Sequence, residues 1–431
     1  MRRGGNSVRI GLVGKPNVGK STFFAAATLI PVDIANYPFC TIEPNVGFSF
    51  IPSRQPCPCG GLRKRLEEDG RAQFSDERGG SICSPRTGSC EGHQRYVPCM
   101  LVDVAGLVPG ASQGRGRGNA FLSDLAECDA LIQVIDVAGT TDIEGNPTGV
   151  KATKEQAIEQ ALAEVEFLTS ELDAWLLGLV KEGWSRGARR IQAEGVKGFI
   201  QFLQERLSGL GATDSICQRS FDAFAQQHSD MTSPWDWSDD VLTLLASSIR
   251  KHLFPIFVAG NKADLAPEGV LDHLRNVLPS FTPCSAETEL ALRQAGKAGF
   301  ITYTAGDSSF ELCDSQTMND AQVKGLSVLA ERVKKLEGTG LIKLLDQVLF
   351  DELQRIVVYP VQDESQWTDG DGNVLPDALV VQNGTQAKQL AYKVHTDLGD
   401  GFIKGVDGRT RRIVGAEHEL SDGDVLRIHS K

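Results

Sequence analysis

The chain has 431 residues, of which 41% are hydrophobic and 23% charged, and its net charge is −12. This length predicts several domains, and no apolar run approaches the roughly 18 residues that a membrane span requires. The negative net charge disfavours indiscriminate binding to a phosphate backbone, so we expect no DNA specificity and only local contact with any RNA. The amino-terminal residues lack a secretory pattern, which predicts a cytoplasmic protein with mostly reduced cysteines.

The first chemical motif lies between a predicted strand, VRIGLVG, and a predicted helix that begins at Ser21. The intervening segment satisfies the pattern GxxxxGK[ST], and a strand before it with a helix after it is the context that a phosphate-binding loop needs. Its backbone amides can converge on phosphate oxygens, Lys20 can reach the outer phosphates, and the Ser21 hydroxyl suits Mg²⁺. The predicted nucleotide-binding residues here are Gly14, Lys15, Pro16, Asn17, Val18, Gly19, Lys20, Ser21 and Thr22.

Further strand-like runs occur at 100–106, 131–139 and 254–264, separated by helical segments. This alternation predicts a mostly parallel, doubly wound α/β sheet, which we assign to a nucleotide-binding domain at 7–149 and 251–356. The tetrapeptide DVAG occurs twice, after Val102 and after Ile135. In a doubly wound fold the metal-orienting carboxylate ends the strand beside the phosphate-loop strand, so we choose Asp103 and expect Asp136 to be a structural turn residue.

Residues 54–97 are rich in glycine, arginine, cysteine and proline, with few apolar residues, which predicts a mobile excursion between two strands of that domain. Four of its thiols could come together as thiolate ligands of zinc, and Cys99 follows them closely in the sequence. However, the CxC spacing lacks the paired CxxC half-sites of most zinc sites, so packed or solvated thiols remain the alternative. The candidate zinc ligands are Cys57, Cys59, Cys83 and Cys90.

Residues 150–250 are predicted to form a helical, coiled-coil-like insertion. Apolar residues recur there at steps close to three and four, and a second helical segment at 188–210 could pair with the first as an antiparallel hairpin. These helices either pack only on each other and the domain or form an arm that docks a partner. The first stripe comprises Ile158, Leu162, Val165, Leu168, Leu172, Trp175, Leu176 and Leu179.

The choice of base depends on NKAD at 261–264, which follows a strand and should lie at the carboxyl edge of the sheet. A carboxylate at Asp264 can accept from the N1 and N2 donors of guanine, and adenine presents no such pair, so the residues favour GTP over ATP. Alone, the tetrapeptide could be a capped strand-to-helix turn. The other predicted base-site residues are Asn261 and Lys262, together with Ser285 and Ala286 through their backbone amides.

Residues 357–431 show strand, helix and strand patterns that predict a small α+β domain. The domain carries more acidic than basic residues, so Arg409, Arg411 and Arg412 form its local basic run. These arginines suit phosphate contact, and a charge cluster that faces water at a strand edge is the alternative.

Together these residues resemble the Obg-related branch of P-loop GTPases, specifically the YchF-like group with a C-terminal TGS domain. The resemblance covers most of the chain and is carried by the segments at 11–28, 35–47, 102–111 and 261–264, by VYPVQDESQWTDGDGNVLPD and by the LAYKVHTDL helix. It implies a β-grasp fold for the last domain and ribosome or RNA contact through that domain and the helical insertion. Obg-like ATPases of the group have an altered base motif, whereas NKAD is intact here.

The resemblance also implies roles at the phosphates. Thr41 would close on Mg²⁺ beside Ser21, and a hydrophobic residue such as Leu107 is expected where other GTPases place a water-orienting glutamine. Asn17 matches an asparagine that helps hold K⁺ in cation-stimulated relatives, although it could simply bond the loop. Arg115 and Arg117 are rival charge donors.

The sequence therefore predicts a Mg²⁺-dependent GTPase, a nucleotide-controlled switch that converts GTP to GDP and phosphate and is linked to translation. Lys20 would stabilise charge, Asp103 would orient the metal through water, and Gly106 would sense the terminal phosphate. Two alternatives stay open. One is a ribosome- or RNA-associated binding module with a structural nucleotide, and the other is an ATPase of the YchF-like type.

Overall fold

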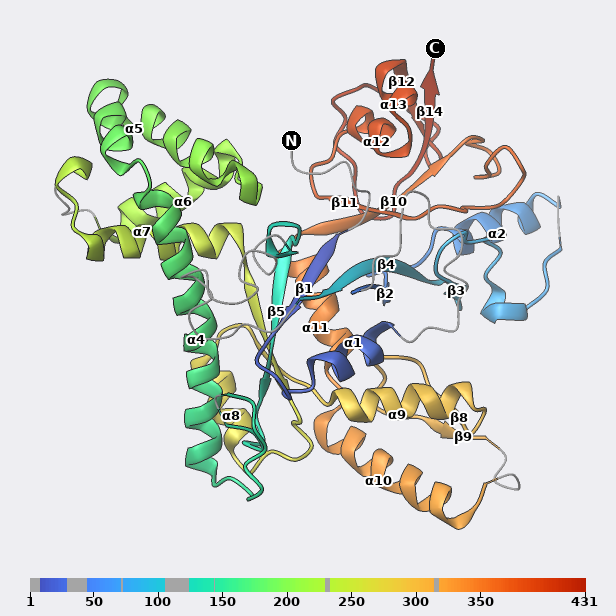
Figure 1. Ribbon diagram of the computed structural model, residues 1–431. Helices are drawn as coiled ribbons and strands as arrows, with labels where there is room; N and C mark the ends of the chain where they lie inside the picture. The colour runs from blue at the N-terminus through green and yellow to red at the C-terminus, as the bar shows by residue number, and fades with distance from the viewer. Residues whose placement is uncertain are drawn as a thin grey trace. The chain divides into compact units, whose positions relative to one another are not determined.

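The computed structural model describes residues 8–28, 45–70, 73–104, 124–142, 144–228, 233–313 and 318–431. The chain divides into two compact units (Figure 1). The first is built mainly from Arg9–Ala27 and Leu101–Leu341, and the second mainly from Thr28–Met100 and Ile342–Lys431. None of the helices in the described ranges combines the length and apolar character that crossing a membrane requires.

The first unit is organised around parallel strands: β1 (Arg9–Val13), β5 (Ala130–Asp136), β6 (Ile256–Asn261) and β7 (Phe281–Pro283). β1 pairs with β5, β5 with β6, and β6 with β7, all in parallel. The end of β4 (Gln94–Asp103) lies beside β1, where the Val104 amide donates to the Leu12 carbonyl over 3.1 Å. Every residue of β5 is buried, as expected for a parallel strand covered on both faces.

The remaining elements of this part are helices and one small hairpin. Their bounds are α1 (Lys20–Thr28), α8 (Val270–Val277), α9 (Ala286–Lys297), β8 (Ile301–Thr302), β9 (Glu311–Leu312) and α10 (Asp320–Leu336). This arrangement confirms the predicted parallel α/β fold. All predicted phosphate-loop and base-motif residues fall at the carboxyl ends of β1, β6 and β7 or in the segments that follow them.

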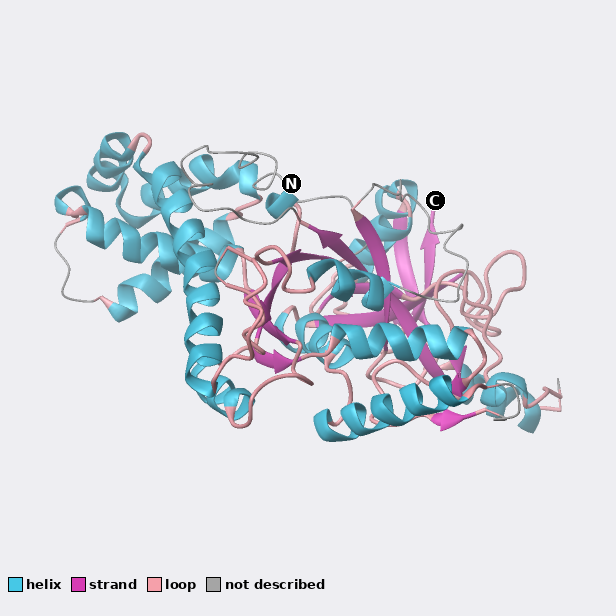
Figure 2. Cartoon of the chain, turned by 60° about the horizontal axis from the view of Figure 1, so that its bottom comes forward, coloured by secondary structure: helices cyan, strands magenta, loops and turns pink. Residues whose placement is uncertain are grey.

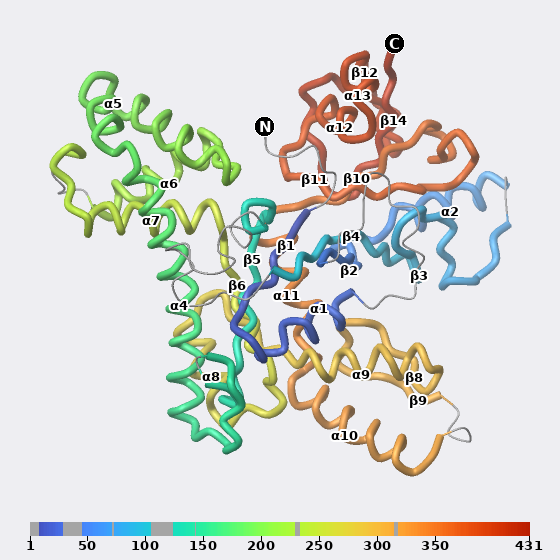
Figure 3. Tube along the Cα trace, viewed as in Figure 1, coloured from blue at the N-terminus to red at the C-terminus, as the bar shows by residue number. Residues whose placement is uncertain are grey.

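In its described residues the helical insertion forms an arm of four long helices, which can be followed in the trace of Figure 3 from green to yellow and which Figure 2 draws in cyan, like the other helices. They are α4 (Lys154–Lys181), α5 (Trp184–Leu207), α6 (Asp214–Gln227) and α7 (Asp239–Leu253), with short 3-10 turns η3 (Ser208–Leu210) and η4 (Pro234–Asp236). The expected two-helix hairpin is therefore incomplete. α7 packs along α4, and α5 is interrupted at Gly195, whose φ is 67°.

The long helix α4 belongs to two environments. It starts with a capping box between Thr153 and Gln156, and its first turns pack Ala157 and Ala161 into the core formed with β5, β6 and α8. Beyond Leu168 its buried residues face the arm instead. The sheet-covering helix and the base of the arm are thus one continuous element, and the insertion has no break at its junction with the domain.

In the second unit the segment predicted as an excursion between two strands contains secondary structure of its own. β2 (Val46–Pro52) is followed by α2 (Cys59–Glu68), the short turn η1 (Glu77–Gly80), β3 (Cys90–Glu91) and the start of β4. α2 has a weak helical signal in the sequence, because two glycines follow Cys59 at its start and only Leu62 and Leu66 are apolar residues at helical spacing. Buried cysteines supply much of the remaining packing.

The C-terminal part of this unit confirms the predicted small α+β domain. It contains α11 (Leu341–Asp346), η6 (Gln347–Glu352), β10 (Arg355–Val361), β11 (Leu379–Gln382), α12 (Ala387–Val394), α13 (Thr396–Asp400), β12 (Phe402–Asp407), β13 (Ile413–Val414) and β14 (Val425–Ser430). The strands form a five-stranded sheet in the order β11-β10-β14-β12-β13. Leu390 of α12 packs on this sheet with Val358 and Leu426, which gives the domain its own core.

Candidate nucleotide-binding site

The phosphate loop connects β1 to α1 in a form that its glycines permit. A Cβ atom at Gly14 would collide with the carbonyl oxygen of Val134, and one at Gly19, whose φ is 91°, would collide with the side-chain amide of Asn261. Asn17 also adopts a positive φ of 62°. Glycine is therefore needed at two positions of the motif because neighbouring strands approach the loop closely.

The predicted base motif holds this loop directly. The Asn261 Nδ2 atom donates to the Val18 carbonyl over 2.8 Å, and its Oδ1 atom accepts from the Ala286 amide over 3.0 Å. Lys262 Nζ donates to the Asn17 carbonyl over 3.0 Å. The phosphate loop thus meets, at one sheet edge, two segments that lie more than 240 residues further along the chain.

Asp264 lies beside the same edge with both carboxylate oxygens engaged. Oδ1 accepts from Ser285 Oγ over 2.7 Å, and Oδ2 lies 3.0 Å from a guanidinium nitrogen of Arg332. The Asp264 side chain is only 3% exposed, whereas that of Arg332 is 32% exposed. Arg332 lies on α10. The sequence did not predict its contact with Asp264, because no recognisable motif surrounds it.

Lys20, the lysine of the phosphate-loop motif, forms an ion pair with Asp103 at the end of β4. Ser21 lies exposed in the first turn of α1, and Thr22 follows it. A hydroxyl and a carboxylate are oxygen donors of the kind that Mg²⁺ prefers, so these residues fit that ion. The predicted Thr41 and Gly106, together with Leu107, Arg115 and Arg117, lie outside the described residues.

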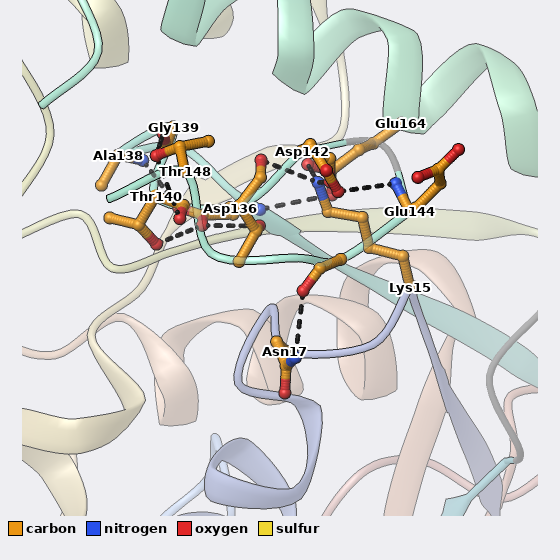
Figure 4. Close-up of polar contacts among 12 residues, drawn as sticks. Lys15, Asn17, Asp136, Ala138, Gly139, Thr140, Asp142, Glu144, Thr148 and Glu164 are labelled. Atoms are coloured by element: carbon orange, nitrogen blue, oxygen red, sulfur yellow. Dashed lines mark hydrogen bonds and ion pairs between the residues drawn. The ribbon is translucent and has the colours of Figure 1, made fainter. Parts of the chain in front are cut away.

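A buried ion pair joins the phosphate loop to the helical arm's first helix. Lys15 Nζ lies 2.7 Å from Glu164 Oε1 of α4, and both side chains are almost fully buried. Lys15 also donates to the carbonyls of Thr141 and Asp142, in the segment after β5 (Figure 4). Lys15 was predicted as a nucleotide-binding residue, but its ammonium is directed at Glu164 and these carbonyls.

Burial raises the pKa of Glu164 to about 7, and the attraction of Lys15 opposes this shift only in part. The ionised form is thus penalised by desolvation even with a lysine in contact. Glu164 continues the buried stripe of α4 between Ala161 and Leu168. A glutamate within an apolar stripe was the sequence signal that could have revealed this pair.

Asp136 organises the turn after β5 and contacts the base motif. Its carboxylate accepts from Thr140, Thr141 and the Ala138 amide. Lys262 Nζ also lies 2.9 Å from its Oδ2 atom. Burial alone would raise the pKa of Asp136, but the hydrogen bonds from Lys262 and Thr140 outweigh it and hold the pKa below its usual value. The expected turn residue therefore also links β5 to the base motif.

Asn17 uses its amide nitrogen within the protein. Nδ2 donates to the Gly145 carbonyl over 3.0 Å, so Asn17 and Lys15 both reach the segment after β5 (Figure 4). A cation would bind the other polar atom of this amide group, the Oδ1 oxygen of Asn17.

In the second unit, the four predicted thiols come together. Their sulfur atoms all lie within 4.8 Å of one another, and all four residues are buried. This geometry is compatible with a metal ion. We refer to Cys57, Cys59, Cys83 and Cys90 as the four-cysteine cluster.

The fold and the site define a class of protein: a P-loop nucleotide-binding protein with a guanine-type base motif. Residues 9–169 match the family described as 50S ribosome-binding GTPase, and residues 259–363 match the domain described as Obg-like GTPase YGR210-like, G4 motif-containing domain. Residues 372–430 match the TGS domain.

Relatives extend this match over almost the whole chain. An uncharacterized GTP-binding protein of Methanocaldococcus jannaschii is 41% identical over 98% of each chain. Obg-like ATPase 1 of Xenopus laevis is 38% identical over 98% of this chain and 92% of its own. A crystal structure of a GTP-binding protein from Pyrococcus horikoshii superimposes with a TM-score of 0.68 at 32% identity, covering 98% of this chain and all of the other. The chain belongs to the YchF-like group of Obg-related P-loop GTPases.

Proposed function

We propose that this chain is a GTPase that converts GTP to GDP and phosphate and uses its nucleotide state as a switch. The observation that carries the proposal is the meeting of Asn261 and Lys262 with the phosphate loop, because it puts a base-recognition motif and a phosphate cradle on one edge. Family membership supports nucleotide binding, and turnover is our inference.

The carboxylate of Asp264 supports guanine as the base. Guanine offers two adjacent N–H donors to a carboxylate, and adenine offers none in that position. Arg332 now holds one of the two oxygens, so a bound guanine would compete with it for Asp264. The name of the Xenopus relative, Obg-like ATPase 1, makes ATP the alternative substrate that experiment must exclude.

At the phosphates we assign Lys20 to charge stabilisation and Ser21, Thr41 and Asp103 to the metal, with Gly106 as the sensor of the terminal phosphate. The Lys20–Asp103 ion pair supports this because it brings the cationic and anionic groups together at the loop. Mg²⁺, when bound with the nucleotide, would neutralise charge on the outer phosphate oxygens.

A monovalent cation could substitute for the missing glutamine. We propose K⁺ beside Asn17, where a cation would offset charge that develops between the outer phosphates. The bond from Asn17 Nδ2 to the Gly145 carbonyl fixes the amide group, and its oxygen remains the candidate ligand.

The switch would act through α4. Lys15 ties the phosphate loop to Glu164, so a change in the loop would reach the arm through one side-chain contact. We further propose that the arm and the TGS domain contact RNA or the ribosome, with Arg409, Arg411 and Arg412 as phosphate contacts. All three arginines are exposed, which supports that role.

The test combines turnover and base exchange. Steady-state hydrolysis of GTP and ATP with Mg²⁺ is measured in KCl and in NaCl at equal ionic strength, and a higher GTP rate in KCl is expected. Asp264→Asn should lose GTP affinity and gain xanthosine triphosphate affinity, because xanthine presents an oxygen where guanine presents an amino group. Asp272→Asn, an exposed aspartate of α8, is the matched control.

Three outcomes would decide against parts of the proposal. Stoichiometric GTP binding with no turnover in either salt would favour the binding module. Preferential ATP turnover by the unaltered protein would overturn the guanine assignment. Equal GTP rates in both salts would remove the potassium role.

A further inference from the structure

The four-cysteine cluster is built for one ion rather than for disulfide bonds. The Cys57 and Cys83 sulfur atoms are 3.9 Å apart, as are those of Cys59 and Cys90. A disulfide requires about 2.05 Å. Four sulfurs around a tetrahedral Zn²⁺ at about 2.3 Å lie about 3.8 Å from each other.

The cluster is closed to solvent and to substrates. Exposure does not exceed 3% at any of its four residues. A catalytic zinc site keeps one position for water, whereas a structural site fills all four with protein ligands. Four buried sulfurs within 4.8 Å also leave room for a single ion and not for a cluster of several irons.

We propose that the four-cysteine cluster binds one structural Zn²⁺ and that this ion stabilises residues 54–97 against the TGS domain. On binding, each thiol releases its proton to solvent, and four thiolates coordinate the ion with a net charge of −2. Thiolate sulfur is the ligand type for which Zn²⁺ has high affinity.

Polar groups around the sulfurs fit a negatively charged centre. His93 Nδ1 lies 3.3 Å from the Cys59 sulfur, and Ser81 Oγ lies 3.5 Å from the Cys90 sulfur. A histidine N–H or a hydroxyl can donate to a thiolate and so orient it, as outer-shell groups do in metal sites.

A buried arginine supplies the second, independent observation. Arg95 is fully buried and is the cross-strand partner of Cys90 in the β3–β4 pair. Its two Nη atoms donate to the carbonyls of Leu375 and Pro376, while Nε has no hydrogen-bond partner among the described residues. A desolvated guanidinium is costly without nearby negative charge. Asp377 supplies some of that charge, because Arg95 is among the groups that oppose the burial-driven rise in the pKa of its carboxyl, and a four-thiolate zinc centre would add more.

The segments that carry the thiols also carry the contacts to the TGS domain. Directly after Cys83, the Ser84 amide donates to the Val374 carbonyl over 2.8 Å and the Arg86 amide to Pro376 over 3.0 Å. Arg86 also pairs with Asp369 and Asp377. An ion that fixes Cys83 would therefore fix the strand-like contact beside it.

The helix that begins at Cys59 makes the other contact. Arg65 of α2 donates to the Ser365 carbonyl over 2.7 Å, and its guanidinium lies over the Trp367 ring at 4.9 Å. The segment has a small apolar core. Apart from the four cysteines, its described buried apolar residues are Pro58, Leu62, Leu66 and Val97.

The first test is the metal content of the full chain, purified under reducing conditions without chelators or a metal-affinity tag. We expect one equivalent of zinc by elemental analysis. Exchange of this zinc for Co²⁺ should give the intense thiolate charge-transfer bands of a four-sulfur site. Because these measurements use the unaltered protein, they do not depend on whether a variant folds.

Variants locate the ion. Cys83→Ser and Cys90→Ser should lower the zinc content to about a tenth, and His93→Ala should weaken zinc affinity by about 10- to 100-fold. Cys99→Ala, a buried cysteine of β4 outside the cluster, and Cys313→Ser are matched controls that should retain one equivalent.

Several results would overturn the proposal. They are one equivalent of iron in place of zinc, failure of the reduced protein to take up Zn²⁺ or Co²⁺, disulfides within the cluster in freshly isolated protein, or full zinc content in Cys83→Ser. None of these results bears on GTP turnover, so the zinc proposal and the proposed function can fail separately.

Discussion

The phosphate-loop edge and the four-cysteine cluster are two ways of holding chain segments that are far apart in sequence. At the loop, protein groups satisfy one another: Asn261 bonds Val18, Lys262 bonds Asn17, and Lys15 meets Glu164. In the cluster, four buried sulfurs lie within 4.8 Å of one another. The first arrangement needs no ligand to close its contacts, whereas the second has a shape that one ion would complete.

This difference predicts where each unit responds to the loss of its ligand. Removing the nucleotide should leave the sheet and its edge intact, because backbone carbonyls accept most of the bonds. Removing the ion should release the segments around the thiols. The predictions below test this contrast, beginning with the largest expected effect.

Stripping zinc should open residues 54–97 locally. We expect the amides of Ser84 and Arg86 to lose nearly all protection from hydrogen exchange, because coordination supplements a small apolar core. Exchange mass spectrometry of the full chain before and after chelation under reducing conditions measures this. Protection in β5 and β6 serves as the internal control and should not change. Equal loss in both units would mean that the ion supports the whole chain and would remove the contrast.

Lys20→Ala should weaken GTP binding by roughly 100-fold or more, because the phosphates lose their nearest ammonium group. Titration with a fluorescent GTP analogue measures the effect. Lys324→Ala, on the exposed face of α10, is the control and should bind as the unaltered protein does. Zinc content should be the same in all three proteins, and a loss of zinc in Lys20→Ala would contradict the independence of the two sites.

Glu164 should make stability depend on pH near neutrality. Its pKa rises from an ordinary 4.5 to about 7 in the folded chain, so the folded state binds the proton more tightly than the unfolded state. This contribution is fully present below about pH 4.5 and is lost as pH rises through about 7. A shift of that size corresponds to roughly 3 kcal/mol of unfolding free energy.

Denaturant titrations between pH 5 and pH 8 on the unaltered chain and on Glu164→Gln isolate this term. The variant should show a shallower decline in stability with rising pH, because its neutral amide does not titrate. Glu166→Gln, two residues along α4, is the control, and parallel curves for all three proteins would argue against the raised pKa.

Arg332→Ala should have the smallest effect. Removing the arginine frees the second oxygen of Asp264, and since Arg332 is partly exposed, the gain in GTP affinity should be a few-fold at most. ATP affinity should not change. Calorimetry with both nucleotides, using Arg275→Ala as an exposed control, measures the ratio. A loss of GTP affinity would mean that Arg332 assists the base instead of competing with it.

The sequence predicts one part of this molecule better than the other for a physical reason. A phosphate loop and a base motif are contiguous because each binds its ligand with a few successive backbone groups, so strand, loop and helix signals around Gly14 and Asn261 are sufficient. The pair of Lys15 and Glu164 joins residues that lie far apart, and only the fold brings them together.

The missed helices follow the same logic. α7 carries an apolar stripe at helical spacing, so its sequence does contain a helix signal. The stripe comprises Leu242, Leu245, Ala246, Ile249 and Leu253. α2 is different, because its glycines and charges give no clear stripe. Its cysteines were recognised as a group, but CxC followed by distant single cysteines does not specify whether the sulfurs converge.

The position of Glu164 on α4 has a mechanical consequence. From Glu164 to Val180 the helix rises about 24 Å, at about 1.5 Å per residue. If the helix tilted by about 10° at the phosphate loop, the far end of this stretch would move by about 4 Å. The arm would thus act as a lever whose stroke is set by helix length, and adding or deleting a turn beyond Glu164 would rescale the movement without altering the nucleotide site.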